Sequence, residues 1–509
     1  MASDRSSYIL SIPHGMTKRT KVAINKLPTG VPGLDQILGG GLPEFSFNIL
    51  AGTPGCGKTT LAHQIAFANA TAERPALYFT ILGEPALKML RYQQQYDFYD
   101  EAKMGTAIRF VNLSEQVLKG DWNAVLDAII KEVEVVSPAI VVVDSFRSLA
   151  RKVNGGSGEM DLQAMVQRLS MHLTTWQATT FLLGEYSEAE LSGDAVFTVA
   201  DGIITLHQSM NRNSMVRKLQ VLKCRGQETL PGMHIFRITN NGLHAFPRML
   251  GRNPDQNQKR TGKRLSMGIP ELDAMMAGGA REGDSIMISG ATGTGKSILS
   301  THFIAEGLRQ GESAVVAVFE ERPAEYEARA ATFGFDFKTP QENNKLEILY
   351  LRPLDLTVDE ALHDIMKAVQ RVGAKRLVID SLQGFERALA PDFREEFEES
   401  LYRMFISLTG VGVTILSTLM VEESFTRAPV TNYSVSFLTD DIIRLRYVEI
   451  DGKLRKILNV TKMRGGEHSK EIRQYDITDK GLELNTSEYI GLLTGLPVRS
   501  VGAFMTDKP

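Results

Sequence analysis

Apolar residues recur along this chain with two periods. Short continuous apolar runs have the length of buried strands, and they lie at residues 46–52, 75–82, 139–145 and 179–185. Residues 121–136 instead repeat with a helical period, with Asp121 as N-cap and an apolar stripe formed by Trp122, Val125, Ile129, Val133 and Val136. Strands that alternate with helices predict an α/β fold, with a mostly parallel sheet covered on both faces.

A different pattern closes each half of the chain. Residues 201–246 and 440–466 contain strand-like runs without an intervening helix, and each segment holds an Asp-Gly pair typical of hairpin turns. We therefore expect antiparallel strands to extend each parallel sheet, with turns at 201–202 and 451–452.

Four sequence blocks recur in the same order. They are 29–43 with 267–281, 52–59 with 290–297, 139–145 with 376–381, and 221–226 with 460–465. Lys58 and Lys296 lie 238 residues apart, Asp144 and Asp380 lie 236 apart, and Lys223 and Lys462 lie 239 apart. Such nearly equal offsets indicate a duplicated domain.

A polar, basic segment with Pro and Gly separates the two copies and is typical of a linker. The expected organisation is an N-terminal extension (1–24), a first domain (25–246), the linker (247–262), a second domain (263–484) and a short C-terminal tail (485–509).

Each copy contains the pattern GxxxxGK[ST], preceded by an apolar strand and followed by a helical pattern. In such a P-loop, glycines let backbone N–H groups converge on phosphate oxygens, and the lysine reaches the terminal phosphates. The candidate ATP-binding residues are Gly52, Thr53, Gly55, Cys56, Gly57, Lys58, Thr59 and Thr60 in the first copy, and Gly290, Thr292, Gly293, Thr294, Gly295, Lys296, Ser297 and Ile298 in the second. The sequence therefore predicts two ATP sites.

Each P-loop is joined by an aspartate that ends an apolar strand. Thr59 with Asp144, and Ser297 with Asp380, supply a hydroxyl and a carboxylate, which are ligands that suit Mg²⁺. An ordinary polar strand end is the alternative for the aspartates.

The candidate general base differs between the copies. Glu320 and Glu321 follow a strand next to the expected phosphate site, where a paired carboxylate could orient water. The equivalent positions in the first copy hold Leu82 and Gly83, and Glu84 comes one residue late. We expect the second site to carry most catalysis; solvated acids are the alternative for the two glutamates.

Two cations alternate along a strand near the end of each copy. Lys223 with Arg225, and Lys462 with Arg464, should point the same way and suit phosphate charge, in the first copy as part of the ATP site and in the second as catalytic groups. A solvated strand face is the alternative.

Composition narrows the functional classes. The 509 residues carry 57 Lys+Arg and 60 Asp+Glu, a net charge of −3, so no nucleic-acid partner is expected. Two cysteines form no disulfide framework, and no stretch reaches the roughly 20 apolar residues of a membrane span. With no signal-peptide pattern, a cytoplasmic protein without a membrane partner is expected. Cys56 and Cys224 read as small apolar filling.

The motifs GTPGCGKT, GATGTGKS, FEERP, VVVDS, VIDS and TKMRGG, doubled in this order, resemble the KaiC family, over about residues 25–500. The resemblance implies two tandem RecA-like P-loop domains, a homohexamer of two stacked rings with ATP between subunits, and both cation pairs acting in trans. It further implies an ATPase in the first domain and a Ser/Thr autokinase in the second.

Two departures from the family pattern bear on its partners, and a third bears on phosphorylation. The segment between 116 and 121 is short where clock members have a longer one implicated in KaiB docking, and the tail used for KaiA is short. A KaiA-like partner is therefore not expected, and a KaiB-like partner is disfavoured. The family's adjacent phosphorylated Ser and Thr correspond to Ser436 and Phe437, with another hydroxyl at Thr431, so at most a single phosphosite is expected.

The sequence is therefore compatible with three candidate functions. The first is a KaiC-like hexameric ATPase with a circadian-like or stress-signalling role. The second is a RecA/RadA-like DNA-dependent ATPase, which the net charge disfavours. The third is a nucleotide-gated scaffold without turnover, which Mg-ATP hydrolysis would exclude.

Overall fold

A computed structural model describes residues 23–81, 86–118, 122–146, 158–187, 190, 196–211, 214–248, 262–351, 357–389, 397–421, 438–450, 452–464 and 466–488. Nearly all of the expected N-terminal extension and most of the linker and the tail lie outside these ranges. So do Asp121, the N-cap expected for the helix at 121–136, Glu84, Thr431 and Ser436.

The elements of the first half follow the predicted alternation. They are β1 (Lys26–Leu27), α1 (Leu34–Ile37), β2 (Leu42–Pro43), β3 (Phe47–Gly52), α2 (Lys58–Asn69), β4 (Ala76–Thr80), α3 (Ala86–Gln93), the 3₁₀ helix η1 (Glu101–Lys103), β5 (Ile108–Asn112), α4 (Ser114–Leu118), α5 (Trp122–Val136), β6 (Ile140–Asp144), α7 (Gly158–Thr175), β7 (Thr179–Glu185), α8 (Val196–Val199), β8 (Gly202–Asn211), β9 (Ser214–Cys224), β10 (Met233–Thr239) and β11 (Gly242–Phe246). Helix α5 coincides with the amphipathic segment read from the sequence, and Val125, Ile129 and Val133 are buried on its inner face.

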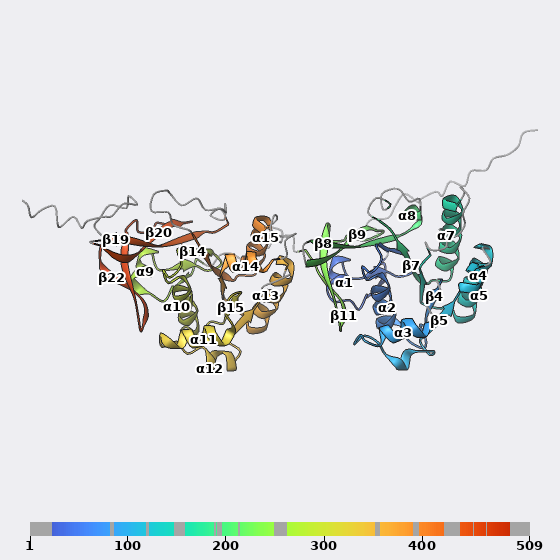
Figure 1. Ribbon diagram of the computed structural model, residues 1–509, viewed down its shortest axis with the longest axis horizontal. Helices are drawn as coiled ribbons and strands as arrows, with labels where there is room; N and C mark the ends of the chain where they lie inside the picture. The colour runs from blue at the N-terminus through green and yellow to red at the C-terminus, as the bar shows by residue number, and fades with distance from the viewer. Residues whose placement is uncertain are drawn as a thin grey trace, which may run out of the picture. The chain divides into compact units, whose positions relative to one another are not determined.

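The second half repeats this order (Figure 1). Its elements are β12 (Arg264–Leu265), α9 (Pro270–Met275), β13 (Ala280–Arg281), β14 (Ser285–Gly290), α10 (Lys296–Arg309), β15 (Ala314–Val318), α11 (Pro323–Thr332), α12 (Lys338–Glu342), β16 (Leu346–Tyr350), α13 (Val358–Val372), β17 (Arg376–Asp380), α14 (Leu382–Ala388), α15 (Phe397–Thr409), β18 (Thr414–Met420), β19 (Asp441–Ile450), β20 (Lys453–Met463), β21 (Arg473–Thr478) and β22 (Gly481–Glu488).

Each half builds one large mixed sheet with the same strand order. In the described residues the orders are β11-β10-β9-β8-β3-β7-β6-β4-β5 and β22-β21-β20-β19-β14-β18-β17-β15-β16. Strands β14 to β18 pair in parallel, so their carboxyl ends meet at one edge, where P-loop sites are built. The predicted α/β class with mostly parallel sheets is confirmed.

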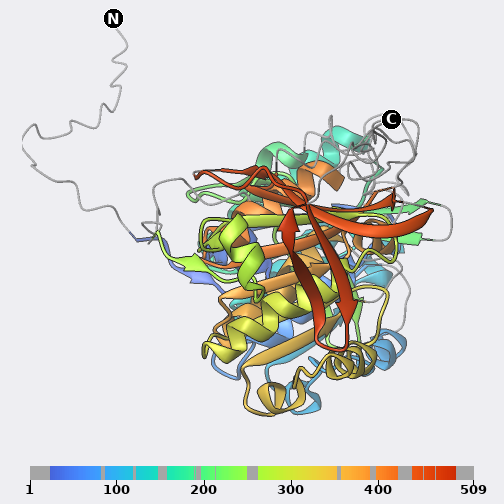
Figure 2. The same cartoon turned by 90° about the vertical axis from the view of Figure 1, so that its left-hand side faces the viewer.

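The added strands differ in part from the expectation. β19 joins β14 in parallel, and antiparallel pairing begins only with β20 and continues to β22. The Asp-Gly pair at 451–452 does lie between β19 and β20, whereas Asp201 and Gly202 stand at the entry to β8 and form no hairpin turn. Figure 2 shows the long strands of this segment in red.

Helices cover both faces of the second sheet. Ile286 and Ile288 of β14 pack with Leu299 and Phe303 of α10, whereas Met287 faces the cluster that contains α13 and α15. Adjacent strand residues point to opposite faces, so a continuous apolar run serves both layers.

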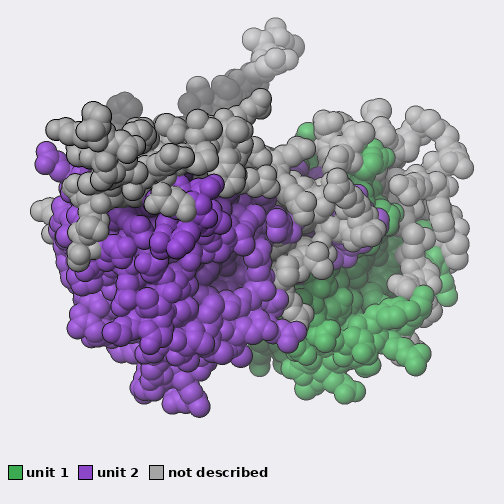
Figure 3. Space-filling model, turned by 60° about the vertical axis from the view of Figure 1, so that its left-hand side comes forward, with its two compact units in different colours: residues 1–205, 221–231, 238–243 green, residues 206–220, 232–237, 244–509 purple. Residues whose placement is uncertain are grey.

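The described chain falls into two compact units, coloured separately in Figure 3. One comprises residues 1–205, 221–231 and 238–243, and the other comprises the rest. This division cuts through β8, β9, β10 and β11, so the expected domain limits stay a prediction. No helix among the described residues is both long and apolar enough to cross a lipid bilayer.

Candidate nucleotide-binding sites

The first P-loop joins β3 to α2. The strand ends at Gly52, and the helix begins at Lys58, directly after Gly57, whose φ of 106° lies in the left-handed region that glycine adopts readily. The ammonium of Lys58 donates hydrogen bonds of 2.9 Å to the carbonyls of Gly52 and Thr53. The lysine is therefore held over the loop at the start of the helix.

The second P-loop joins β14 to α10 in the same way. Gly295 has a φ of 97°, and the ammonium of Lys296 donates to the carbonyls of Gly290 and Ala291, again at 2.9 Å. Burial lowers the pKa of Lys296 below its ordinary value. In each loop, the helix N-terminus and the lysine thus point at one position. This arrangement favours a bound phosphate.

The other predicted loop residues lie in the two turns or in the first helical turn. Cys56 is buried, which raises the pKa of its thiol, and Lys58 is close to its sulfur at 3.8 Å. Thr294 is also buried, with its hydroxyl donating to the Ala291 carbonyl. Both cysteines are free, and Cys224 is half-buried.

In the first half, Asp144 lies directly beside the P-loop. Its Oδ2 accepts hydrogen bonds from the Thr59 hydroxyl at 2.8 Å and from the Tyr78 hydroxyl at 2.9 Å. Burial raises the pKa of Asp144, and these two bonds oppose that rise. Tyr78 is fully buried and stacks on His63, with ring centroids 4.4 Å apart. The sequence reasoning missed both aromatic partners.

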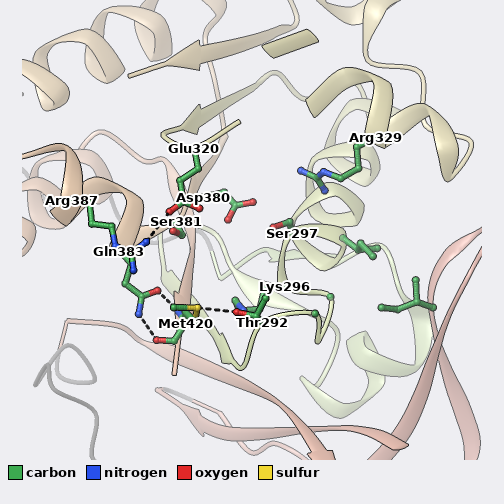
Figure 4. Close-up of a pocket in the computed structure, with 14 residues that line it drawn as sticks. Thr292, Lys296, Ser297, Glu320, Arg329, Asp380, Ser381, Gln383, Arg387 and Met420 are labelled. Carbon is green, nitrogen blue, oxygen red and sulfur yellow. Dashed lines mark hydrogen bonds and ion pairs between the residues drawn. The ribbon is translucent and has the colours of Figure 1, made fainter. Parts of the chain in front are cut away.

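In the second half, Asp380 accepts a hydrogen bond of 2.6 Å from Thr418 of the neighbouring strand β18. Asp380, Lys296 and Ser297 line one cavity of about 390 Å³, shown in Figure 4. The full lining is Thr292, Gly293, Gly295, Lys296, Ser297, Ile298, Glu320, Arg329, Asp380, Ser381, Gln383, Arg387, Met420 and Ile477.

The structure separates the two tandem glutamates. Glu320 lines the cavity with its side chain 62% exposed and lies 3.7 Å from Arg387. Glu321 does not line it; its carboxylate forms a two-pronged ion pair with Arg329, at 3.1 and 2.9 Å. Only Glu320 is therefore placed to meet a molecule in the cavity.

The two cation pairs lie beyond the P-loops, at the ends of β9 and β20. Arg225 pairs with Asp201 at 3.0 Å, and Arg464 with Asp440 at 3.8 Å. Lys462 donates to the Thr439 carbonyl at 2.6 Å, and burial, reinforced by the charge of Arg464, lowers its pKa. Lys462 and Arg464 are not among the described residues that line the second cavity.

Five further polar or sulfur-containing residues line the cavity without having been predicted: Arg329, Ser381, Gln383, Arg387 and Met420. Gln383 and Arg387 had a usable signal, since they stand four apart on α14, which begins two residues after Asp380, and so share a helix face. Gln383 accepts from the Met420 backbone N–H at 2.8 Å, which ties α14 to β18.

Comparisons with known proteins give matches along nearly the whole chain. The family model described as "ATPase: KaiC" matches residues 27–249 and 265–489. The circadian clock oscillator protein KaiC of Rippkaea orientalis is 29% identical over 498 residues, covering 95% of this chain and 93% of that protein. The protein of the same name from a Picosynechococcus species is 29% identical, with coverages of 94% and 93%, and KaiC 1 of a Synechocystis species is 29% identical, with 94% and 92%.

Proposed function

Since this chain belongs to the KaiC family of ATPases, we propose that it binds ATP at both P-loops and hydrolyses it mainly at the second. The observation that carries this proposal is the second cavity, which Lys296, Ser297, Asp380 and Glu320 line together. A lysine, a hydroxyl and two carboxylates are the groups that hold phosphate, metal and water in P-loop ATPases.

The oxygen donors at both sites suit Mg²⁺, which is usually bound through one or two carboxylates together with substrate phosphates and water. Thr59 and Asp144 place a hydroxyl and a carboxylate 2.8 Å apart. We propose that this pair, and Ser297 with Asp380, hold Mg²⁺ beside the nucleotide. Bound there, the ion would neutralise charge on the phosphates.

Glu320 is the proposed general base. It accepts the proton of a water whose oxygen bonds to the γ-phosphorus, while the bond from that phosphorus to the bridging oxygen breaks and ADP leaves. Lys296 stabilises the charge that develops on the phosphate oxygens. Leu82 and Gly83, which have no carboxylate, occupy the equivalent positions of the first half. ATP held by Lys58 and Thr59 therefore mainly stabilises the structure and is hydrolysed slowly.

We also propose a homohexamer with ATP at the subunit interfaces. Lys223 with Arg225, and Lys462 with Arg464, would then reach the nucleotide of a neighbouring subunit. Support comes from the second pair, which stands apart from the residues that line its own cavity.

The proposals for the biological role, the location and the phosphosite come from the sequence. We propose a regulatory, cytoplasmic protein with a circadian-like or stress-signalling role, in which the second domain phosphorylates Ser436, or Thr431 in its place. The three relatives named above are circadian clock oscillator proteins. Phosphopeptide mapping after incubation with Mg-ATP, compared with Ser436→Ala, tests this: phosphate on neither residue would refute it.

ATP turnover tests the central proposal. Lys296→Ala should remove most hydrolysis by the full chain, whereas Lys58→Ala should mainly weaken an ATP-dependent oligomer seen by light scattering. Arg464→Ala should lower turnover without unfolding the protein. Hydrolysis that depends on added DNA would favour the recombinase-like alternative, and no hydrolysis would favour the scaffold.

A further inference from the structure

The tandem glutamates of the second site stand in different surroundings. Glu320 is 62% exposed and turned to the cavity, whereas Glu321 is 30% exposed and bound at both oxygens by Arg329. A two-pronged arginine–carboxylate pair fixes orientation as well as charge, because the planar guanidinium matches the carboxylate at two points. Glu321 is therefore fixed, and Glu320 is not bound in this way.

Arg329 is itself held firmly. It lies on α11, and its guanidinium stacks over the ring of Tyr326 at 4.7 Å, one helical turn earlier. Tyr326 is fully buried, and its hydroxyl lies 3.5 Å from that of Thr301 on α10. We call the ion pair of Arg329 with Glu321 the clamp. Through Tyr326 and Thr301, the clamp is connected to α10, the helix that begins at the second P-loop.

Arg329 also forms part of the cavity wall, with its guanidinium turned towards Ser297 and Asp380 in Figure 4. Its Nε and Nη2 bond to Glu321, and its buried Nη1 has no hydrogen-bond partner within the described parts of the chain. The charge of Asp380 acts on the guanidinium and, after the bond to Glu321, helps to hold its pKa above the ordinary value. Without Arg329, the charge of Glu321 would be uncompensated behind this wall and free to turn towards a bound polyphosphate.

Resting on the proposed ATPase function, we propose that Arg329 is a positioning residue of the second site. It neutralises Glu321 and holds that carboxylate out of the cavity. Glu320 is then the only carboxylate of the pair that meets the attacking water, and the nucleotide phosphates meet no added negative charge.

The first half provides a matched control. Arg91 stands 238 residues before Arg329, on the equivalent helix α3, but it is exposed, and the sequence holds Gly83 where the second half has Glu321. With no carboxylate to restrain at that position, Arg91→Gln should leave turnover and nucleotide affinity unchanged.

A double-mutant cycle in the full-length protein tests the proposal. Arg329→Gln frees Glu321 and should raise both KM for ATP and the Kd of a fluorescent ATP analogue about tenfold. This is the scale of losing one charge-assisted hydrogen-bonded pair. Adding Glu321→Gln removes the freed charge and should restore both constants to within about threefold of the wild type, while Arg329→Lys should fall between.

The outcomes separate the possibilities. If the double variant is as impaired as Arg329→Gln, then Arg329 contacts the phosphates itself and the proposal fails. Unchanged constants in Arg329→Gln would overturn it as well. Thermal melting checks that each variant folds, and Arg329→Lys serves if Arg329→Gln does not. A wild-type protein that binds the analogue without hydrolysis would refute the proposed function, and the analogue's Kd would still test the clamp.

Discussion

In the first half, Asp144 receives hydrogen bonds from Thr59 and Tyr78, whereas in the second half Asp380 receives one from Thr418 and faces Arg329 across the cavity. Tyr78 and Val316 occupy the same register, each paired with the residue two before the aspartate. Both halves thus support the aspartate from a neighbouring strand, through Tyr78 of β4 in the first and Thr418 of β18 in the second. The second half adds Arg329 of α11, which lines the same cavity as Asp380.

This difference would let a duplicated fold serve the two roles proposed for its halves. The loops, the lysines and the strand ends are the same, because the phosphate-binding geometry depends on backbone conformation. The side chains around them differ, and in the second half they leave Glu320 exposed at the cavity. The following experiments address this contrast.

The largest effect is expected at Glu320. Glu320→Gln should lower ATP turnover about 10²–10⁴-fold, because a positioned general base contributes that much. Glu321→Gln is the matched control and should lose far less, since Arg329 already holds its charge. Steady-state hydrolysis measures both; equal losses would show that the two carboxylates act as a unit.

Asp441 should make the stability of the second half depend on pH. It opens β19 where Gly202 opens β8, it is fully buried, and neither carboxylate oxygen has a hydrogen-bond partner among the described residues. Burial, with the charges of Asp284 and Asp440, raises its pKa to about 7, against the opposing charge of Arg264 and a contact with the Arg464 backbone.

The sign follows from proton binding. Between about pH 4 and 7 the folded state binds more protons at Asp441 than the unfolded state, so stability falls as the pH rises through this window. Asp441→Asn should remove that fall and raise the free energy of unfolding at pH 8 by on the order of a few kcal/mol. Urea unfolding at pH 5 and pH 8 measures this, with the exposed Asp476→Asn as control; a slope that survives in Asp441→Asn would contradict it.

The opposite slope is expected from His302. Leu482 donates its backbone N–H to His302 Nε2 at 3.0 Å, and the equivalent pair in the first half is Leu243 with Gln64, at 2.7 Å. Burial lowers the pKa of His302 to about 4. Neutral His302 therefore contributes its full stabilisation above about pH 6.5. As the pH falls towards 4, the free energy of unfolding decreases by on the order of 3 kcal/mol.

Replacing His302 by the residue of the first half isolates this effect. His302→Gln keeps an acceptor for Leu482 but cannot be protonated, so the loss below pH 6.5 should become smaller. Thermal melting at pH 7 and pH 5 measures it, and Gln64→His should introduce a similar loss into the first half. Identical profiles for wild type and His302→Gln would show that this contact does not titrate.

The sequence was sufficient for features that depend on local pattern. The glycine-rich loops, the aspartates and α5 follow from spacing, because a P-loop is a backbone motif between a strand and a helix. The separation of Glu320 from Glu321 was not predicted, although adjacent residues at a strand end tend to point apart. Arg329 could not be found, because it depends on how α11 packs against the strand end and on the buried ring of Tyr326.

The smallest effect is expected at Tyr78. Its hydroxyl donates to Asp144 Oδ2 and lowers the carboxylate's pKa, against burial, which raises it. Tyr78→Phe removes that hydrogen bond and keeps the ring stacked on His63, so Asp144 should ionise less readily and hold Mg²⁺ more weakly. A hydrogen bond to a charged group is worth about 1.5 kcal/mol at the lower end, or roughly tenfold in the Mg²⁺ concentration needed for binding.

Titrating Mg²⁺ against a fluorescent ATP analogue in a Lys296→Ala background would measure the effect of Tyr78→Phe. Tyr326→Phe in the second half is the control in a Lys58→Ala background, because its hydroxyl lies near Thr301 and makes no hydrogen bond to Asp380 among the described contacts. A shift that is equal in both halves would mean that Tyr78 acts through packing and not through Asp144.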